Sequence, residues 1–255
     1  MPNPLLDGPP EARIAACAAL LERVSPPTEQ ELDALCAALA DPHKAVQRRA
    51  AETAAALTKR GARLGERLRV ALDADELRHR WGAVYTLSLI GPVPRAALPT
   101  LLALLGSDDG DLRWAAAELL KRLAESHREA VVGPLLTIAH APGAQRKMAL
   151  YCLRDLAVGS GFDAALAALA DAEIETRLAA LAVLAQVHPS AAAAVQHIVP
   201  LLDDADPRMQ RAAAATLGSL DVSTHEVIDA LRRVESRPDP SLRRAAARSL
   251  RLLQR

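Results

Sequence analysis

A short motif centred on Arg or Gln recurs along the chain at an almost constant spacing. Its central residues are Gln47, Arg80, Arg113, Arg146, Arg177, Gln210 and Arg243. Successive copies are therefore 33, 33, 33, 31, 33 and 33 residues apart, and an eighth copy fits at Arg13. A fixed period of this length is typical of stacked supersecondary units, because a single unit cannot bury its apolar face alone. The spacing predicts a stack of small repeats.

Each repeat is predicted to contain two helices and no strand. Hydrophobic residues make up 51% of the 255 residues, chiefly as Ala and Leu, whereas aromatic residues make up 2%. Ala and Leu favour helices, and residues that suit a pleated sheet are too few for a large sheet. Turns rich in Asp, Gly and Pro separate the helical patterns. Pro99, Pro134 and Pro200 fall inside first helices, which each of them is predicted to bend.

The repeated motif points to a known family. Segment 41–52 reads Asp-Pro-His-Lys-Ala-Val-Gln-Arg-Arg-Ala-Ala-Glu. This segment and its counterparts resemble HEAT repeats, in particular the bacterial, armadillo-like kind, from about Asp7 to Leu253. The resemblance implies an all-α, right-handed α-solenoid of about seven and a half bihelical repeats, with the second helices on the concave face. We expect one domain over residues 1–255, with a half-repeat at about 7–25 and full repeats over 26–253.

The resemblance also implies a ladder in which turn aspartates pair with second-helix arginines between repeats. An Asp stands six residues before the central residue in only four of the eight copies. The ladder is therefore expected to be partial. Its candidate residues are Asp7, Arg13, Asp41, Gln47, Arg80, Arg113, Arg146, Asp171, Arg177, Asp204, Gln210 and Arg243.

Every Trp and Tyr of the chain falls on one face of the second helices, in three consecutive repeats. Helical periodicity places this face opposite the apolar stripe. Clustered large aromatic side chains beside charged groups are typical of binding surfaces. The predicted concave binding surface comprises Trp81, Tyr85, Trp114, Glu118, Lys121, Lys147, Tyr151 and Arg154. The alternative is that these rings pack between neighbouring second helices and fill the groove.

The two ends of the stack are expected to act as caps. The first cap is the helical segment 11–24, and the second is the Arg-rich last helix. In the last helix, Arg244, Arg248 and Arg251 recur at helical spacing opposite an apolar stripe. We interpret these arginines as the polar outer face that a terminal repeat needs.

Charge and cysteine content restrict the location and partners of the protein. The net charge is zero, with 31 basic and 31 acidic residues, which disfavours a general polyanion binder. No apolar run is long enough to span a membrane, and the first residues do not resemble a secretory signal. Cys17, Cys36 and Cys152 lie in apolar helical patterns without a Cys-x-x-Cys pair, so they are expected to be buried thiols. These features predict a cytoplasmic, monomeric protein.

The sequence lacks the common catalytic motifs. No phosphate-binding glycine loop, metalloprotease motif or nucleophile elbow occurs. No catalytic residue, metal site or cofactor is therefore predicted. Deoxyhypusine hydroxylases, which have HEAT-like repeats, bind iron through several His-Glu pairs, and only His225-Glu226 is present here.

The predicted function is a non-catalytic scaffold or adaptor that binds a protein or peptide on its concave face. One alternative is a DNA-binding protein or an alkylpurine DNA glycosylase of HEAT-like fold, because Trp114 and Glu118 resemble the aromatic and carboxylate groups of those enzymes. The zero net charge disfavours this alternative. A second alternative, which rests on the repeat alone, is an accessory protein similar to phycobilin lyases or to chaperones.

Overall fold

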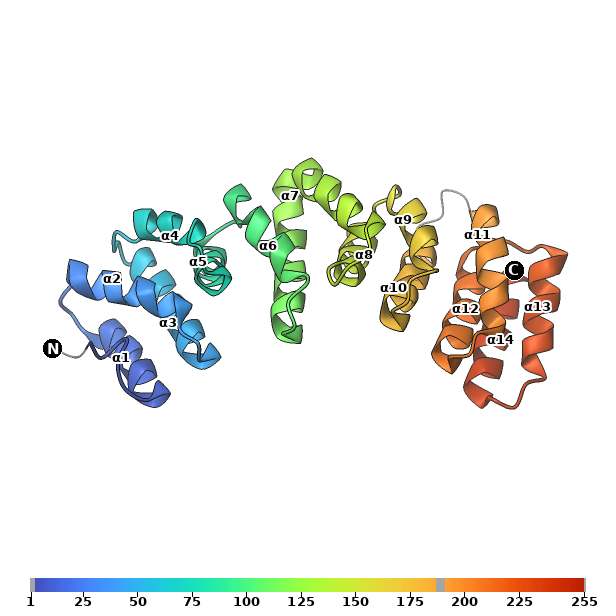
Figure 1. Ribbon diagram of the computed structural model, residues 1–255, viewed down its shortest axis with the longest axis horizontal. Helices are drawn as coiled ribbons and strands as arrows, with labels where there is room; N and C mark the ends of the chain where they lie inside the picture. Colours follow the sequence, from blue (N-terminus) through green and yellow to red (C-terminus); the bar gives the residue numbers. More distant parts are fainter. Residues whose placement is uncertain (1–2, 187–190, 255) are drawn as a thin grey trace. The chain divides into compact units, whose positions relative to one another are not determined.

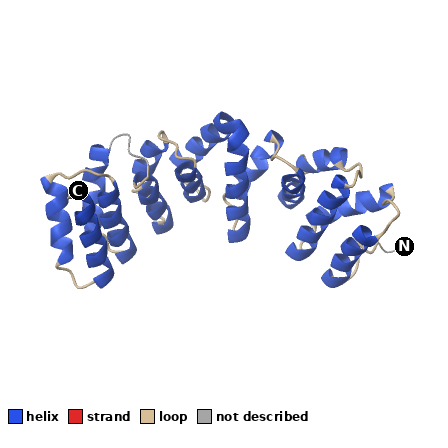
Figure 2. Ribbon diagram, turned by 180° about the vertical axis from the view of Figure 1, so that it is seen from behind, coloured by secondary structure: helices blue, strands red, loops and turns tan. Residues whose placement is uncertain are grey.

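The computed structural model describes residues 3–186 and 191–254, and all regular structure in these residues is helical (Figures 1 and 2). The prediction of an all-α fold is confirmed. The α-helices are α1 (Pro10–Glu22), α2 (Glu29–Ala37), α3 (Lys44–Lys59), α4 (Gly65–Leu72), α5 (Leu77–Ile90), α6 (Leu98–Leu104), α7 (Gly110–His140), α8 (Arg146–Asp155), α9 (Gly161–Ala168), α10 (Ile174–Leu184), α11 (Ala191–Ile198), α12 (Pro207–Ser219), α13 (His225–Glu235) and α14 (Pro240–Leu253). Three short 3-10 segments are η1 (Ala38–Ala40), η2 (Arg95–Ala97) and η3 (Val199–Asp203).

The helices form two compact units. Unit 1 comprises Met1–Ala103 with Glu125–His127, and unit 2 comprises Leu104–Ala124 with Arg128–Arg255. In unit 1, α1 packs on α3 and α3 packs on α5. In unit 2, α8, α10, α12 and α14 pack in succession. Second helices of consecutive repeats therefore lie side by side within each unit.

Unit 1 is held by leucines and by one close backbone approach. Leu35, Leu39 and Leu68 are among its fully buried side chains. A Cβ atom added at Gly82 of α5 would lie 2.7 Å from the Cβ of Leu39 in η1. Because this separation is too short for two carbon atoms, only glycine lets α5 approach η1 so closely.

Unit 2 repeats a side-chain to backbone hydrogen bond between neighbouring second helices. Thr216 Oγ1 in α12 donates to the carbonyl oxygen of Leu181 in α10 at 3.4 Å. Ser249 Oγ in α14 donates to the carbonyl oxygen of Ala214 in α12 at 2.8 Å. A hydroxyl that faces the preceding repeat thus ties consecutive second helices together in an otherwise apolar interface.

The helix ends follow the turn chemistry of the sequence. The carboxylates of Asp109, Asp206 and Asp239 cap α7, α12 and α14 by accepting hydrogen bonds from backbone N–H groups two residues later. At α2, Thr28 and Glu31 form a reciprocal capping box. The aspartates predicted to mark turns therefore also begin helices.

The prolines predicted to bend first helices act mainly at helix joints. Pro99 is the second residue of α6, and Pro200 lies in η3, directly after α11. Within α7 the non-helical residue is His127 (φ −134°, ψ 46°), whereas Pro134 lies inside the helical part that follows. The break between the two helices of this repeat therefore falls at the turn residue His127, and the bend at Pro134 stays a prediction.

Candidate functional site

An exposed aromatic stack lies in unit 2. The rings of Trp114 (α7) and Tyr151 (α8) stack with centroids 5.5 Å apart and an interplanar angle of 24°. Trp114 is 54% exposed, and Tyr151 is half-buried. The guanidinium carbon of Arg154 lies 4.9 Å from the centroid of the Tyr151 ring, which is a cation–π contact. The structure thus brings together three predicted site residues from two consecutive second helices.

A chain of charged groups borders this stack. The Arg154 guanidinium donates to Asp155 Oδ1 at 2.8 and 2.7 Å. Lys121 Nζ lies 3.4 Å from Asp155 Oδ2 and 2.6 Å from Glu118 Oε2. Two of the three predicted cations, Lys121 and Arg154, are therefore paired with carboxylates. Asp155 was not predicted as a site residue, although its place directly after Arg154, at the end of α8, was an available signal.

The network shifts two pKa values upward. The hydrogen bond that Lys121 donates to Glu118 raises the pKa of Lys121 above its usual value, because it favours the ammonium form. Burial raises the pKa of Tyr151, since desolvation disfavours the phenolate. Near neutral pH the site therefore presents a neutral phenol and paired charges. Lys147, also predicted here, is half-buried on α8.

We name Trp114, Glu118, Lys121, Tyr151, Arg154 and Asp155 together the Trp114 surface.

The other aromatic pair is in unit 1 and is mainly core. Trp81 and Tyr85 of α5 stack with centroids 5.7 Å apart. Trp81 is only 7% exposed, and Tyr85 packs against the unit 1 core. The alternative that rings pack between helices thus describes Trp81 better than the prediction of an outward-facing ring. Gly82, which follows Trp81, allows this turn of α5 to lie close to Leu39 of η1.

Ion pairs join consecutive repeats at positions of the predicted ladder. Each joins an arginine near the start of one second helix to the turn aspartate of the following repeat. The pairs are Arg13–Asp41, Arg146–Asp171, Arg177–Asp204 and Arg211–Asp239. Arg211 and Asp239 were not among the predicted ladder residues, because Arg211 follows the aligned Gln210 and Asp239 stands four rather than six residues before Arg243.

At the other ladder positions on second helices, the side chain binds backbone carbonyl groups instead. Four side chains donate to the carbonyl oxygen six residues earlier, in their own repeat: Arg80 to Ala74, Arg113 to Ser107, Gln210 to Asp204 and Arg243 to Arg237. Gln47 donates to the carbonyl oxygens of Leu39 and Arg78. Asp7 accepts a hydrogen bond from the backbone of Asn3. These residues fasten turns rather than bind ligands.

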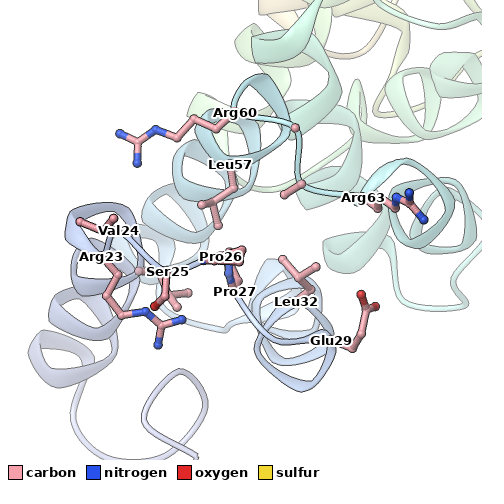
Figure 3. A pocket seen from close by; sticks show the side chains of 13 residues that line it. Arg23, Val24, Ser25, Pro26, Pro27, Glu29, Leu32, Leu57, Arg60 and Arg63 are labelled. Atoms are coloured by element: carbon pink, nitrogen blue, oxygen red, sulfur yellow. The ribbon is translucent and has the colours of Figure 1, made fainter.

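Two pockets lie at the amino-terminal end of unit 1, and no sequence pattern predicted them. One, of about 350 Å³, is lined by 13 residues that include Pro26, Pro27, Leu32 and Leu57 (Figure 3). Figure 3 shows the guanidinium groups of Arg60 and Arg63 pointing to opposite sides rather than converging on an anion site. The second, of about 410 Å³, lies between the segment 3–5, α1 and the start of α2.

The cysteines are buried free thiols, as predicted. Burial raises the pKa of Cys17 and of Cys36 to about 11, and that of Cys152 to about 12. In residues 3–186 and 191–254, no three His, Cys, Asp or Glu side chains gather as they would to hold a metal ion. Within the same ranges, no helix combines the length and the apolar character needed to cross a membrane.

The repeats match a known family model. The model that describes HEAT repeats matches residues 32–121 and 162–251, which together are more than half of the chain. The chain belongs to the HEAT-repeat family. No curated protein sequence matches the chain at a significant level.

Solved structures share the fold of this HEAT-repeat chain. A mutant of Kap121p is 15% identical over 98% of this chain and 33% of its own, with a TM-score of 0.67. A chain from a structure of Kap95p binding to RanGDP is 15% identical over 97% of this chain and 39% of its own, with a TM-score of 0.62. An engineered protein is 21% identical over 98% of this chain and 76% of its own, with a TM-score of 0.53. The prediction of an α-solenoid is confirmed, whereas the number of repeats and the single domain over residues 1–255 stay predictions.

Proposed function

We propose that this HEAT-repeat protein is a non-catalytic scaffold that binds a partner protein or peptide at the Trp114 surface. The observation that carries the proposal is the 54% exposure of Trp114 in a chain with so few aromatic residues. An exposed indole stacked on Tyr151 offers a large, rigid apolar area that loses little conformational entropy on binding. Arg154 and Glu118 border this area and supply polar contacts at its rim.

The charges favour a protein or peptide over nucleic acid as the partner. Lys121 and Arg154 are each paired with carboxylates, so the Trp114 surface has no excess positive charge. Binding to a nucleic acid backbone depends on cations that replace counterions at several phosphates. The same pairing argues against a glycosylase at this site, because such an enzyme must hold DNA. The stack offers no feature that favours a bilin or a chaperone client.

Relatives of the same fold provide a precedent. The Kap95p structure concerns binding of that protein to RanGDP. At 15% identity this likeness extends only to the fold, so the partner of the present protein is inferred from the Trp114 surface. Three buried thiols suit a reducing compartment, and we infer that the protein acts in the cytoplasm as a monomer.

Photo-crosslinking in the native cell tests the proposal. The photoreactive residue p-benzoylphenylalanine replaces Glu118, which is exposed one helical turn from Trp114. We expect crosslinked partner proteins, identified by mass spectrometry, whose yield falls at least roughly tenfold when Trp114→Ala is added, since an aromatic hot spot contributes about 2 kcal/mol or more.

The matched control places the same photoreactive residue at Val70, which is 64% exposed on α4 of unit 1. Trp114→Ala is the informative variant, because Trp81→Ala would remove buried core packing. Equal crosslinking at positions 70 and 118, or crosslinking at 118 that Trp114→Ala leaves intact, would overturn the proposal.

A further inference from the structure

The outward face of the last helix carries arginines and no carboxylate. α14 contains Arg243, Arg244, Arg248 and Arg251, which are all exposed, and its 14 residues include no Asp or Glu. The opposite face, with Leu242 and Ala246 among its members, is buried. We name Arg244, Arg248 and Arg251 the Arg stripe. They stand one, five and eight residues after Arg243, the same register that Trp114, Glu118 and Lys121 occupy after Arg113.

The Arg stripe differs from the other arginines of unit 2. Arg177, Arg208 and Arg211 each form ion pairs with carboxylates of neighbouring segments. Arg244 donates to the hydroxyl of Ser241 at 3.0 Å. Within the described residues, Arg248 and Arg251 have no carboxylate within ion-pair distance. The N–H groups of these two guanidinium groups can therefore donate hydrogen bonds to water or to a ligand.

Packing and helix electrostatics do not account for this arrangement. Like charges three and four residues apart on a helix repel each other. Arg248 is repelled by both Arg244 and Arg251, and this repulsion destabilises α14. Attraction to the carboxyl end of the helix accounts for Arg251 in the last turn, but Arg244 lies near the positive end. A polar cap could carry charges of both signs, which would avoid this repulsion. An external anionic ligand would offset the repulsion among the three arginines.

The size of the Arg stripe indicates the kind of ligand. The first and last of the three arginines are seven residue steps apart, or about 10 Å along the helix. Leu252, which is 37% exposed, lies four residues after Arg248 and adds an apolar contact. Duplex nucleic acid needs many phosphate contacts, but the nearby Arg211 and Arg232 are already paired with Asp239 and Asp229. The surface formed by the Arg stripe and Leu252 has the size to bind a few carboxylates and one apolar side chain.

We propose that the Arg stripe, together with Leu252, binds an acidic peptide segment of a partner protein that carries a large apolar residue. This site goes beyond the proposed function, because it uses α14 and none of the residues of the Trp114 surface. The carboxylates pair with Arg244, Arg248 and Arg251, and the apolar residue contacts Leu252. Binding should weaken as ionic strength rises, because exposed ion pairs are screened by salt.

Fluorescence anisotropy with defined probes tests this proposal on the full chain. The probe is a short fluorescein-labelled peptide of repeated Glu-Glu-Leu units, and a Lys-Lys-Leu peptide, a single-stranded oligonucleotide and phosphatidylserine vesicles are its competitors. We expect saturable binding of the acidic peptide, weakened roughly tenfold by the triple variant Arg244→Gln/Arg248→Gln/Arg251→Gln, since three exposed pairs are lost. The Gln variant removes charge without introducing repulsion, so α14 should keep its fold.

The control is the triple variant Arg48→Gln/Arg63→Gln/Arg95→Gln, which removes the same charge from exposed arginines of unit 1. We expect it to bind the acidic peptide as the wild type does, and circular dichroism checks that each variant stays helical. Loss of binding in the control, no saturable binding to the wild type, or tighter binding of the oligonucleotide or of the vesicles than of the peptide would overturn the proposal.

Discussion

At the scale of single residues, the ion pair between Arg146 and Asp171 is a well-buried link between consecutive repeats. Arg146 Nη1 lies 2.8 Å from Asp171 Oδ2, and Arg146 Nε also donates to the carbonyl oxygen of Ala139. Both side chains are nearly buried. Removing one partner from such a pair leaves an uncompensated charge in a poorly solvated place, which is costlier than losing a surface pair.

Asp171→Ala is therefore expected to lower the free energy of unfolding by about 2–4 kcal/mol, measured by urea denaturation. The matched control is Glu175→Ala, which removes the exposed pair with Arg208 in the same unit and should cost less than about 1 kcal/mol. Equal effects of the two variants would contradict the view that Asp171 holds consecutive repeats together.

Two tryptophans show which part of the candidate site the sequence could predict. Trp81 and Trp114 occupy the same register of successive second helices, so periodicity assigned both to the same face. Exposure also depends on how closely the neighbouring repeat approaches. Gly82, the residue after Trp81, allows α5 to approach η1 closely. The residue after Trp114 is Ala115, which has a side chain at the equivalent position. The stack of Trp114 on Tyr151 and the pairing of Lys121 with Asp155 are contacts between two helices. The position of a residue within its own helix does not determine such contacts.

At the scale of helices, the start of α2 is stabilised by a cap that depends on pH. Hydrogen bonds from the Arg23 side chain and then from the Thr28 backbone lower the pKa of Glu31 to about 2. Because the folded pKa lies below the unfolded one, near 4.5, this carboxylate contributes stability above about pH 4.5. The contribution is lost as the pH falls from about 4.5 toward 2.

Glu31→Gln should therefore destabilise the protein at neutral pH and reduce the loss of stability between about pH 4.5 and 2. Thermal unfolding followed across this range measures both effects. Because Arg23 and Glu31 are partly exposed, the difference at neutral pH should be modest and should decrease in high salt. If Glu31→Gln lost as much stability between about pH 4.5 and 2 as the wild type, the Glu31 carboxylate would not be the source of this pH dependence.

The packing of α5 on η1 depends on the absence of one side chain. A methyl group at Gly82 would meet Leu39, where backbone as well as side-chain atoms lie in the way. Gly82→Ala is therefore expected to destabilise the protein by about 1–3 kcal/mol despite the better helix propensity of Ala. Gly65→Ala is the control, because nothing lies within 4 Å of its added Cβ, and it should be neutral or slightly stabilising.

At the scale of the whole molecule, the composition predicted the helical content, and the repeat period predicted the order of the helix pairs. The period could do so because each repeat must bury the same small and apolar positions against its neighbours. The break at His127, the 3-10 segments and the pockets near α1 depart from the period. These features arise where local turns and single contacts decide the backbone path, and an average repeat carries no information about them.

Stability in such a stack should be local, and Gly218 allows a direct test. A Cβ at Gly218 of α12 would lie 2.7 Å from Ser249 Cα in α14, so Gly218→Ala should separate these helices and break the bond from Ser249 to Ala214. If each repeat is stabilised by its neighbours, amide hydrogen exchange should accelerate in α12, α13 and α14 but not in α1, α3 and α5. Mass spectrometry of peptic fragments resolves these helices, and uniform acceleration would instead show that residues 1–255 unfold as one cooperative domain.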